Sequence, residues 1–213
     1  STNANSWRYR WNLMLMASNG YIVIAPNRRG CTGFGIEWTE DVTKNFGGHA
    51  NDDLLSAIDS IAIPSSVEYV GSYGGFSVFY LESHHNKRFK VFVAHDGLFD
   101  FEQCYLETDE TWFVHNEIGA PWDIKNDEVV KKSYEYSPSN FVDKWDTPIL
   151  VIHGAKDYRS QISHGMQAFN AARIRGVPAK LLIFPDENHW CLKPQNSLLW
   201  DKVFYDWLSK YLK

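Results

Sequence analysis

The stretch Tyr69–Phe76, Tyr-Val-Gly-Ser-Tyr-Gly-Gly-Phe, carries the clearest structural signal in this sequence. The mostly apolar run 67–70 is typical of a strand, and the mostly apolar residues 76–81 suit a buried helix. A serine between glycines at such a junction has the form of a nucleophile elbow, in which the serine takes a strained backbone conformation at the carboxyl end of a strand. The start of the following helix would face an oxyanion formed at Ser72.

The elbow departs from the usual Gly-x-Ser-x-Gly pattern, because Val70 stands two residues before Ser72 and Gly71 stands directly before it. Either Val70 occupies the glycine position, which crowds the turn, or one residue is missing between Gly71 and Ser72. Ser-x-Gly-Gly strings also occur in ordinary loops. The assignment therefore depends on catalytic partners elsewhere in the chain.

Length and composition indicate one domain spanning residues 1–213. The chain has 213 residues, of which 44% are hydrophobic and 15% aromatic, enough for one sizeable core. The net charge is -5 and the basic residues are scattered, which argues against nucleic-acid binding. No apolar run approaches the ~18 residues of a membrane span, and no signal peptide opens the chain. The start, Ser-Thr-Asn-Ala-Asn-Ser without methionine, predicts the C-terminal part of a longer protein.

Predicted strands alternate with predicted helices along most of the chain. This order favours an α/β fold, a mostly parallel sheet with helices on both faces and with ligands at the carboxyl ends of its strands. The glycine-rich segment 26–35 is interpreted as a structural loop, since it lacks the ending of a phosphate-binding loop. Strands are expected at 21–25, 67–70, 91–94, 149–153 and 179–184, helices at 7–18, 52–61, 76–81, 163–175 and 197–211, and loops with short helices over 96–139.

Cysteines and histidines give no metal-binding pattern, so no metal and no cofactor are expected. The cysteines are interpreted as small buried apolar residues: Cys31, Cys104 and Cys191. Four histidines in or beside helices and polar loops are expected to be solvated: His49, His84, His85 and His164. Two histidines that end strands are expected to be hydrogen-bonded structural groups: His95 and His153.

A nucleophilic serine needs a base and an acid that orients the base, and both should follow later strands. Asp157 follows the predicted strand 149–153, and His189 follows the strand 179–184. The chain order Ser72, Asp157, His189 is that of α/β-hydrolases. Each residue alone has another interpretation, since Asp157 can cap a turn and His189 is one of eight histidines.

Motifs distributed over nearly the whole chain resemble the prolyl oligopeptidase (S9) family of serine peptidases. The greatest similarity is to its bacterial dipeptidyl peptidase V and acylaminoacyl-peptidase types, through 94–97 (Ala-His-Asp-Gly) and 185–190 (Pro-Asp-Glu-Asn-His-Trp). The other segments that carry the resemblance are 26–30, 33–35, 72–76, 136–138, 147–154, 176–178 and 188–189.

The resemblance implies an α/β-hydrolase fold and a role for each candidate residue. Ser72 would be the nucleophile, His189 the general base and then acid, and Asp157 the residue that orients His189. The backbone N–H of Tyr73 would be one oxyanion donor.

The resemblance also implies residues that contact the substrate. Arg159 would hold a substrate carbonyl, and a surface salt bridge is the alternative. Trp112 and Phe113, with Tyr73, would form a wall of the pocket for the residue before the scissile bond, and simple packing of these aromatic side chains is the alternative.

The activity implied is that of a serine exopeptidase that releases dipeptides from the N-terminus of oligopeptides. Family members carry a β-propeller, and after it a strand with a glycine-rich turn that helps to form the oxyanion hole, and neither is found in these 213 residues. A homodimer, and a bacterial periplasmic or else cytoplasmic location, are further expectations. A carboxylesterase of the same fold, or a non-catalytic binding domain with a degenerate elbow, are the alternatives.

Overall fold

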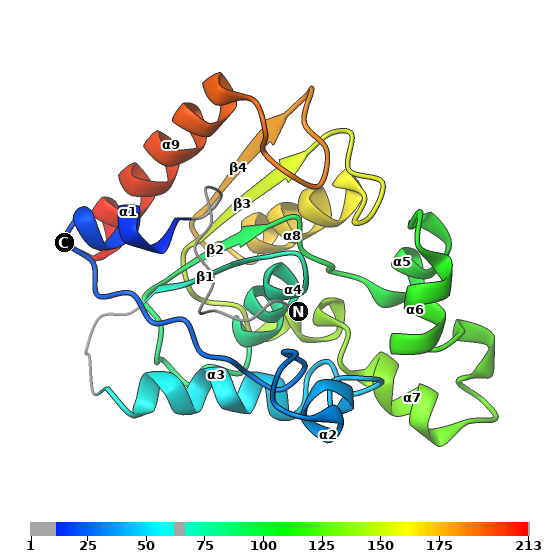
Figure 1. Cartoon of the computed structure of the whole chain (residues 1–213). Coiled ribbons are helices and arrows are strands. Elements are labelled where there is room, and N and C mark those ends of the chain that lie inside the picture. The colour runs from blue at the N-terminus through cyan, green and yellow to red at the C-terminus, as the bar shows by residue number, and fades with distance from the viewer. Residues whose placement is uncertain (1–11, 62–66, 213) are drawn as a thin grey trace.

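A parallel sheet of four strands forms the centre of the computed structural model, which describes residues 12–61 and 67–212 (Figure 1). Its order is β1-β2-β3-β4, and every neighbouring pair is parallel. The strands are β1 (Val67–Gly71), β2 (Val91–His95), β3 (Ile149–Gly154) and β4 (Ala179–Phe184). The structure therefore confirms the predicted α/β class with a parallel sheet.

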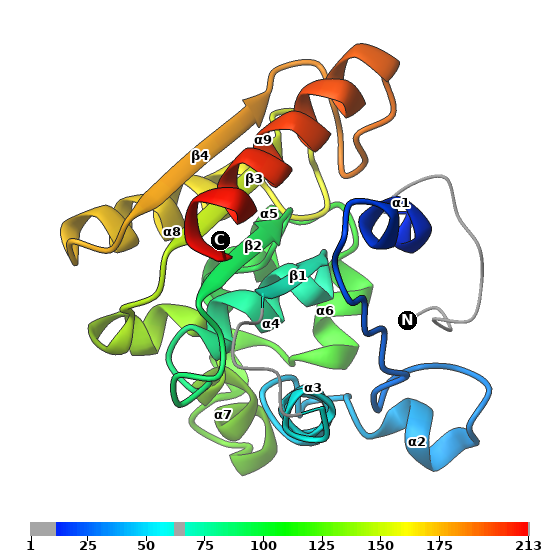
Figure 2. The same ribbon diagram turned by 90° about the vertical axis from the view of Figure 1, so that its left-hand side faces the viewer.

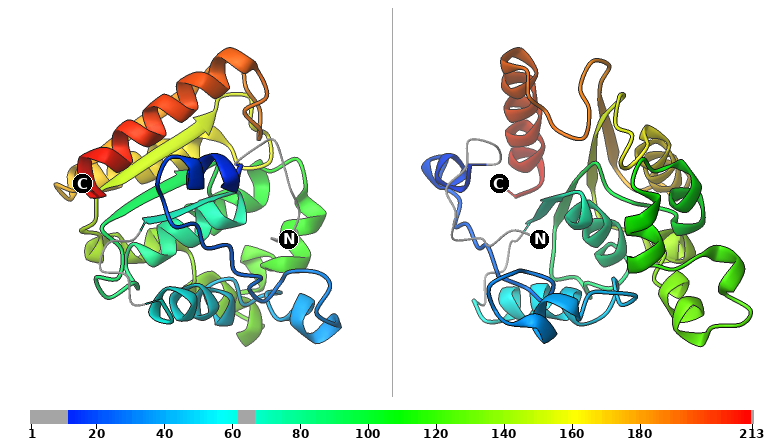
Figure 3. Two further views of the ribbon diagram at one scale, coloured as in Figure 1. Left: turned by 60° about the vertical axis from the view of Figure 1, so that its left-hand side comes forward. Right: turned by 45° about the vertical axis from the view of Figure 1, so that its right-hand side comes forward.

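Helices cover both faces of this sheet. On one face α4 (Tyr73–Leu81) and α8 (Ile162–Ile174) pack in a core with Phe92 of β2. On the other face lies α9 (Pro194–Leu212) (Figure 2). It packs in a core with Val93, the next residue of the same strand. The right-hand view of Figure 3 shows α9 in red and α8 in yellow on opposite sides of the strands. Successive residues of β2 thus face opposite cores, which explains why its apolar run has no polar interruption.

The long connection from β2 to β3 forms a helical region beside the sheet. An aromatic cluster joins this region to the elbow helix, because the ring of Phe76 lies 5.4 Å from that of Phe101. The prediction of short helices over 96–139 is confirmed. The helices of this region are α5 (Phe101–Glu107), α6 (Thr111–Glu117), η1 (Pro121–Asp123), α7 (Glu128–Glu135) and η2 (Pro138–Lys144).

The predicted strand at 21–25 is wrong. No described strand pairs with this segment, and Ile22 is 77% exposed. Tyr21 instead stacks on Tyr205 of α9 with 6.1 Å between ring centroids. A strand satisfies its backbone groups only through a hydrogen-bonded neighbour, and composition alone does not say whether that neighbour is present.

The remaining helices differ from the predictions mainly at their ends. The predicted helix 7–18 appears as α1 (Leu13–Ser18), while residues 7–11 lie outside the described ranges. The predicted helix 52–61 appears as α3 (His49–Asp59), and α2 (Ile36–Glu40) was not predicted. Among the described helices, none combines the length and apolar composition needed to cross a bilayer.

A close backbone contact fixes the elbow against the loop after β2. A Cβ added to Gly75 would lie 2.6 Å from the Cα of Gly97, and one added to Gly97 would lie 2.5 Å from the carbonyl carbon of Gly75. The N–H of Ser72 donates a 2.9 Å hydrogen bond to the carbonyl oxygen of His95. Two glycines are therefore required where α4 crosses the end of β2.

Replacing Gly75 with alanine should lower the free energy of unfolding by about 1–3 kcal/mol, because the new methyl group meets backbone atoms that cannot rotate away. Urea denaturation measures this change. The control is Asn170→Ala at an exposed position of α8, which should change the free energy of unfolding by no more than about 0.5 kcal/mol. Equal stabilities of the two variants would contradict the close approach of α4 to Gly97.

Candidate active site

Ser72 occupies a strained turn between β1 and α4. Its dihedral angles are φ 60° and ψ -118°, which an L-residue with a side chain rarely adopts, and α4 begins at the next residue. The strained turn therefore forms although the residue two before Ser72 is Val70 and not glycine. The N–H of Tyr73 is among the first of the helix, which have no acceptor one turn earlier. Such N–H groups suit a developing negative charge.

His189 and Asp157 meet directly in the structure. His189 Nδ1 donates a 2.7 Å hydrogen bond to Asp157 Oδ2, and both side chains are buried. The other oxygen, Asp157 Oδ1, accepts the backbone N–H groups of Arg159 at 2.9 Å and Ser160 at 3.0 Å. Three donors thus fix the carboxylate, and the carboxylate fixes the imidazole with Nε2 left for another partner.

The strand register brings Ser72 to the same edge of the sheet. Gly71 is paired with His95, His95 with Ile152, and Ile152 with Leu182, so the four strands end nearly side by side. Each candidate residue lies in the loop after one of these ends, at the carboxyl edge where ligands bind in open α/β sheets. The sequence alone identified these three loops, and the structure shows directly the contact between two of them.

The Tyr73 side chain is partly buried. Its hydroxyl donates to the carbonyl oxygen of Phe46 at 2.7 Å, and the Arg28 guanidinium lies 3.7 Å from the ring centroid. Burial raises the pKa of Tyr73 to about 12. Phe113 packs against the same aromatic cluster, whereas Trp112 is 65% exposed and touches Phe113 edge-on. Phe113 is thus partly buried in this cluster, whereas most of the Trp112 ring lies in solvent, and the role of both side chains in a substrate pocket stays a prediction.

Arg159 makes ion pairs in this structure. Its guanidinium lies 3.0 Å from Asp109 and 3.0 Å from Glu110, and its side chain is 40% exposed. The structure thus shows Arg159 in a surface salt bridge, the alternative to its expected contact with a substrate carbonyl. The pairs join the loop after β3 to the start of α6, the helix that carries Trp112.

Sequence reasoning missed one charged residue at this edge. Asp96, directly after β2, is 2% exposed, and Asp96, His153 and Asp157 have ligand atoms within 4.8 Å of one another. This donor set is that of a metal site. However, His153 Nε2 already donates to the Ser160 carbonyl oxygen at 2.7 Å, and Asp157 is engaged by three donors. These bonds favour a hydrogen-bonded network over a cation site. The signal available in the sequence was an aspartate directly after a buried strand.

The four histidines expected to be solvated differ in their burial. His49 is exposed and pairs with Asp41, and His84 is half-buried and stacks on Tyr80. His85 and His164 are buried, so for these two the prediction is wrong. Spacing alone could not show that α8 turns His164 toward the loop after β2.

The other predictions for histidine and cysteine have mixed outcomes. His95 and His153 are buried groups paired with Asp96, as predicted. Cys31 and Cys104 are buried, also as predicted, whereas Cys191 is only half-buried.

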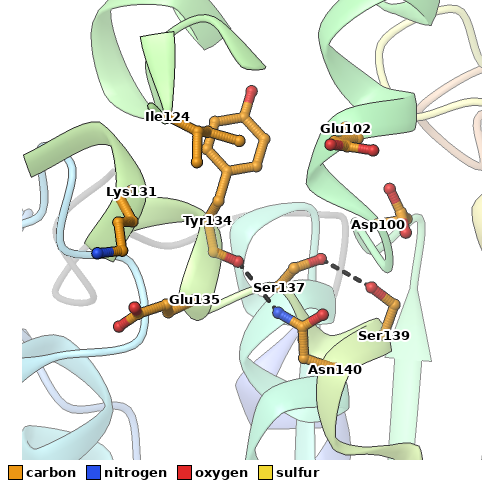
Figure 4. Close-up of a pocket in the computed structure, with 9 residues that line it drawn as sticks. All are labelled: Asp100, Glu102, Ile124, Lys131, Tyr134, Glu135, Ser137, Ser139 and Asn140. Atoms are coloured by element: carbon orange, nitrogen blue, oxygen red, sulfur yellow. Dashed lines mark hydrogen bonds between the residues drawn. The ribbon is translucent and has the colours of Figure 1, made fainter. Parts of the chain in front are cut away.

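Away from this edge, a pocket of ≈ 350 Å³ opens between α5, α7 and η2 (Figure 4). Carboxylates and one amine line it, among them Asp100, Glu102, Lys131 and Glu135. None of the candidate catalytic residues belongs to its lining.

A parallel sheet that carries a strained serine after one strand and a His–Asp pair after two others is the arrangement of the α/β-hydrolase fold. The chain belongs to the prolyl oligopeptidase family of peptidases, whose sequence model matches residues 7–213.

Individual relatives agree with this assignment. A protein of Porphyromonas endodontalis named dipeptidyl-peptidase 5 is 51% identical over 100% of this chain, which covers 32% of that protein. The corresponding protein of Porphyromonas gingivalis is 48% identical over the same share of each chain. This chain thus spans about a third of the length of the curated relatives it matches.

Solved structures support the fold. Acylaminoacyl peptidase from Pyrococcus horikoshii matches 93% of this chain and 34% of its own with a TM-score of 0.82 at 22% identity. Dipeptidyl peptidase 4 from Porphyromonas gingivalis matches 87% of this chain and 26% of its own with a TM-score of 0.73 at 18% identity.

His164 should make stability depend on pH. Burial, with the nearby His153, lowers the pKa of His164 from 6.5 to about 4, and its Nδ1 accepts the N–H groups of Phe99 at 3.2 Å and Asp100 at 3.3 Å. As pH decreases, His164 is protonated near pH 6.5 in the unfolded chain but only near pH 4 in the folded protein. The free energy of unfolding should therefore fall as pH decreases from 6.5 to 4. The contribution is about 1.4 kcal/mol per pH unit in this window.

Urea denaturation of wild type and His164→Gln at several pH values between 6.5 and 4.5 measures this effect. Glutamine offers an acceptor in place of Nδ1 and does not titrate. The free energy of unfolding of the variant should therefore change less steeply with pH than that of the wild type, by the contribution of about one proton. His49→Gln, at an exposed site, is the control. Identical slopes for all three proteins would contradict the neutral buried state of His164.

Proposed function

We propose that this chain is the catalytic domain of a serine peptidase that releases dipeptides from the N-terminus of oligopeptides. The observation that carries the proposal is the buried 2.7 Å hydrogen bond between His189 and Asp157, at the sheet edge that also holds the strained Ser72. Such a pair has the orientation that a general base requires.

The proposed reaction begins when Ser72 Oγ attacks the peptide carbonyl carbon and its proton passes to His189 Nε2. The resulting oxyanion is stabilised by the N–H of Tyr73, at the start of α4. His189 then gives its proton to the leaving amine as the C–N bond breaks, which leaves an ester on Ser72. Water attacks that ester with His189 again as base, and the released acid carries away the peptide fragment.

The substrate class rests on the relatives. Two of them, 51% and 48% identical, are named dipeptidyl-peptidase 5. Release of single acylated residues is the nearest alternative, since acylaminoacyl peptidases share the fold. The greater length of the relatives supports a further domain in the same protein, which we propose to be a β-propeller that admits short peptides. A periplasmic location and a homodimer belong to the same proposal.

A fluorophosphonate should label the intact protein once, on Ser72, because only an activated serine reacts readily. Intact mass and peptide mapping identify the adduct. Ser72→Ala should abolish labelling and leave the fold intact, while Ser77→Ala, at a buried serine of α4, is the control. A folded wild-type protein without an adduct would overturn the peptidase proposal and favour a binding domain.

Replacing Asp157 with asparagine should lower kcat by about 10⁴-fold, because an amide would favour the wrong tautomer of His189. Asparagine keeps the acceptor for the N–H groups of Arg159 and Ser160, so the fold should persist. Asp206→Asn, on the exposed face of α9, is the matched control and should retain full activity.

These assays use a dipeptidyl amide, an N-acylated aminoacyl amide and a short acyl ester. Fastest turnover of the ester would identify a carboxylesterase instead. Retention of more than a tenth of the activity by Asp157→Asn would remove Asp157 from the mechanism.

A further inference from the structure

Asp96 is a buried carboxylate that the proposed reaction does not use. It is 2% exposed and directly follows β2. Its backbone has φ 50°, in the left-handed region, which aspartate enters more readily than most residues with a side chain. A buried charge in a strained backbone is costly to maintain, so its contacts indicate what it does.

Each oxygen of Asp96 contacts a different strand end. Oδ1 accepts the backbone N–H of Gly154 at 3.1 Å, and Oδ2 lies 3.0 Å from Nε2 of His95. Gly154 is the last residue of β3 and begins the turn that carries Asp157. Asp96 therefore connects the end of β2 with the turn that supplies the candidate acid.

His153 lies between the two buried carboxylates. Its Nε2 is 3.7 Å from Asp96 Oδ1 and 3.6 Å from Asp157 Oδ2, while donating to the carbonyl oxygen of Ser160. Helix α8 limits the movement of the ring, because a Cβ added to Gly165 would lie 2.6 Å from His153 Nδ1. The imidazole of His153 thus lies between the carboxylates of Asp96 and Asp157, and the packing of α8 leaves no room for a larger side chain.

The titratable groups around Asp96 come from neighbouring strands and loops, and they include Asp157, which has a carboxylate oxygen within 4.8 Å of one of Asp96. His95 is on β2, His153 is on β3, and His189 is on the loop after β4, together with Cys191. Burial by itself raises the pKa of Asp96, but attraction to His95, then His153 and His189, outweighs it and holds the pKa below its usual value. Burial raises the pKa of Cys191 to about 11, so this thiol is neutral near pH 7.

We propose that Asp96 is a positioning residue whose charge, through His153 and the Asp157 turn, stabilises the protonated form of His189 during the reaction. The inference rests on the proposed function. In a buried site the charge is only weakly screened, so it acts on His189 without touching the substrate. Asp157 contacts His189 directly. Asp96 adds a second negative charge, on a carboxylate that has an oxygen within 4.8 Å of one of Asp157.

The test is Asp96→Asn in the intact protein, because asparagine can still accept the N–H of Gly154 but carries no charge. Loss of a nearby negative charge disfavours the imidazolium, so the pKa that governs the acidic limb of kcat/KM should fall. We expect this limb to move to lower pH by about one unit and kcat to fall by about tenfold, with KM nearly unchanged. Fluorophosphonate labelling should slow in parallel.

Glu82→Gln is the matched control. Glu82 is also a buried carboxylate, it accepts the N–H of Thr147 at 2.9 Å near the other end of β3, and burial raises its pKa well above the usual value. Glutamine has the same shape and can still accept this hydrogen bond. Because Glu82 lies near the opposite end of β3 from the candidate site, this variant should leave the pH profile and kcat unchanged.

Asp96→Gly is a second variant that removes the charge, and glycine adopts the observed φ without strain. It should displace the acidic limb in the same direction as Asp96→Asn. A folded variant with a wild-type pH profile and kcat overturns the proposal. Failure of both variants to fold also overturns it, because Asp96 would then serve only the stability of the fold. Absence of Ser72 labelling in the wild type would instead refute the proposed function.

Discussion

Backbone hydrogen bonds between parallel strands place the carboxyl ends of β1, β2, β3 and β4 at one edge. Ser72, Asp96, Asp157 and His189 each lie in the segment that follows one of these ends. The register leaves little freedom, since a slip by one residue would turn every side chain of a strand to the other face. Burial of β2 and β3 on both faces maintains that register. The geometry of the site is thus a consequence of how the core packs.

The loops then fix the side chains by contacts with one another. The loop that carries His189 packs closely on β3, because a Cβ added to Gly154 would lie 2.1 Å from the carbonyl oxygen of Asn188. The hydroxyl of Ser160 donates to the carbonyl oxygen of Gly97 at 3.1 Å, which joins the loop after β3 to the loop after β2. Hydrogen bonds between neighbouring loops therefore hold the edge together where the sheet itself has ended.

Much of this could be predicted from the sequence. Apolar runs bounded by turn residues identified the four strands, and chain order identified the loops of Ser72, Asp157 and His189, because these signals are local. The failures depend on partners distant in the chain. The run at 21–25 has strand composition but no described neighbour, and the burial of His164 arises only when α8 packs beside β3.

The proximity of Asp96 to Asp157 was not predicted for the same reason, although the position of Asp96 directly after a buried strand could be seen in the sequence. Sixty residues separate two side chains that lie around one imidazole, and no spacing rule connects them. Long-range contacts of this kind are supplied by the fold alone.

The backbone conformations of Ser72 and Asp96 have a consequence for the evolution of this domain. Both residues have positive φ, and they follow neighbouring strands. Such residues cost about 1–3 kcal/mol each, against a total stability of about 5–15 kcal/mol for a typical domain. Glycine at either position would relieve that strain, but it would remove the hydroxyl of Ser72 or the carboxylate of Asp96. Selection for a more stable fold and selection for reactivity therefore act in opposite directions at this edge, and stabilising substitutions should accumulate elsewhere in the domain.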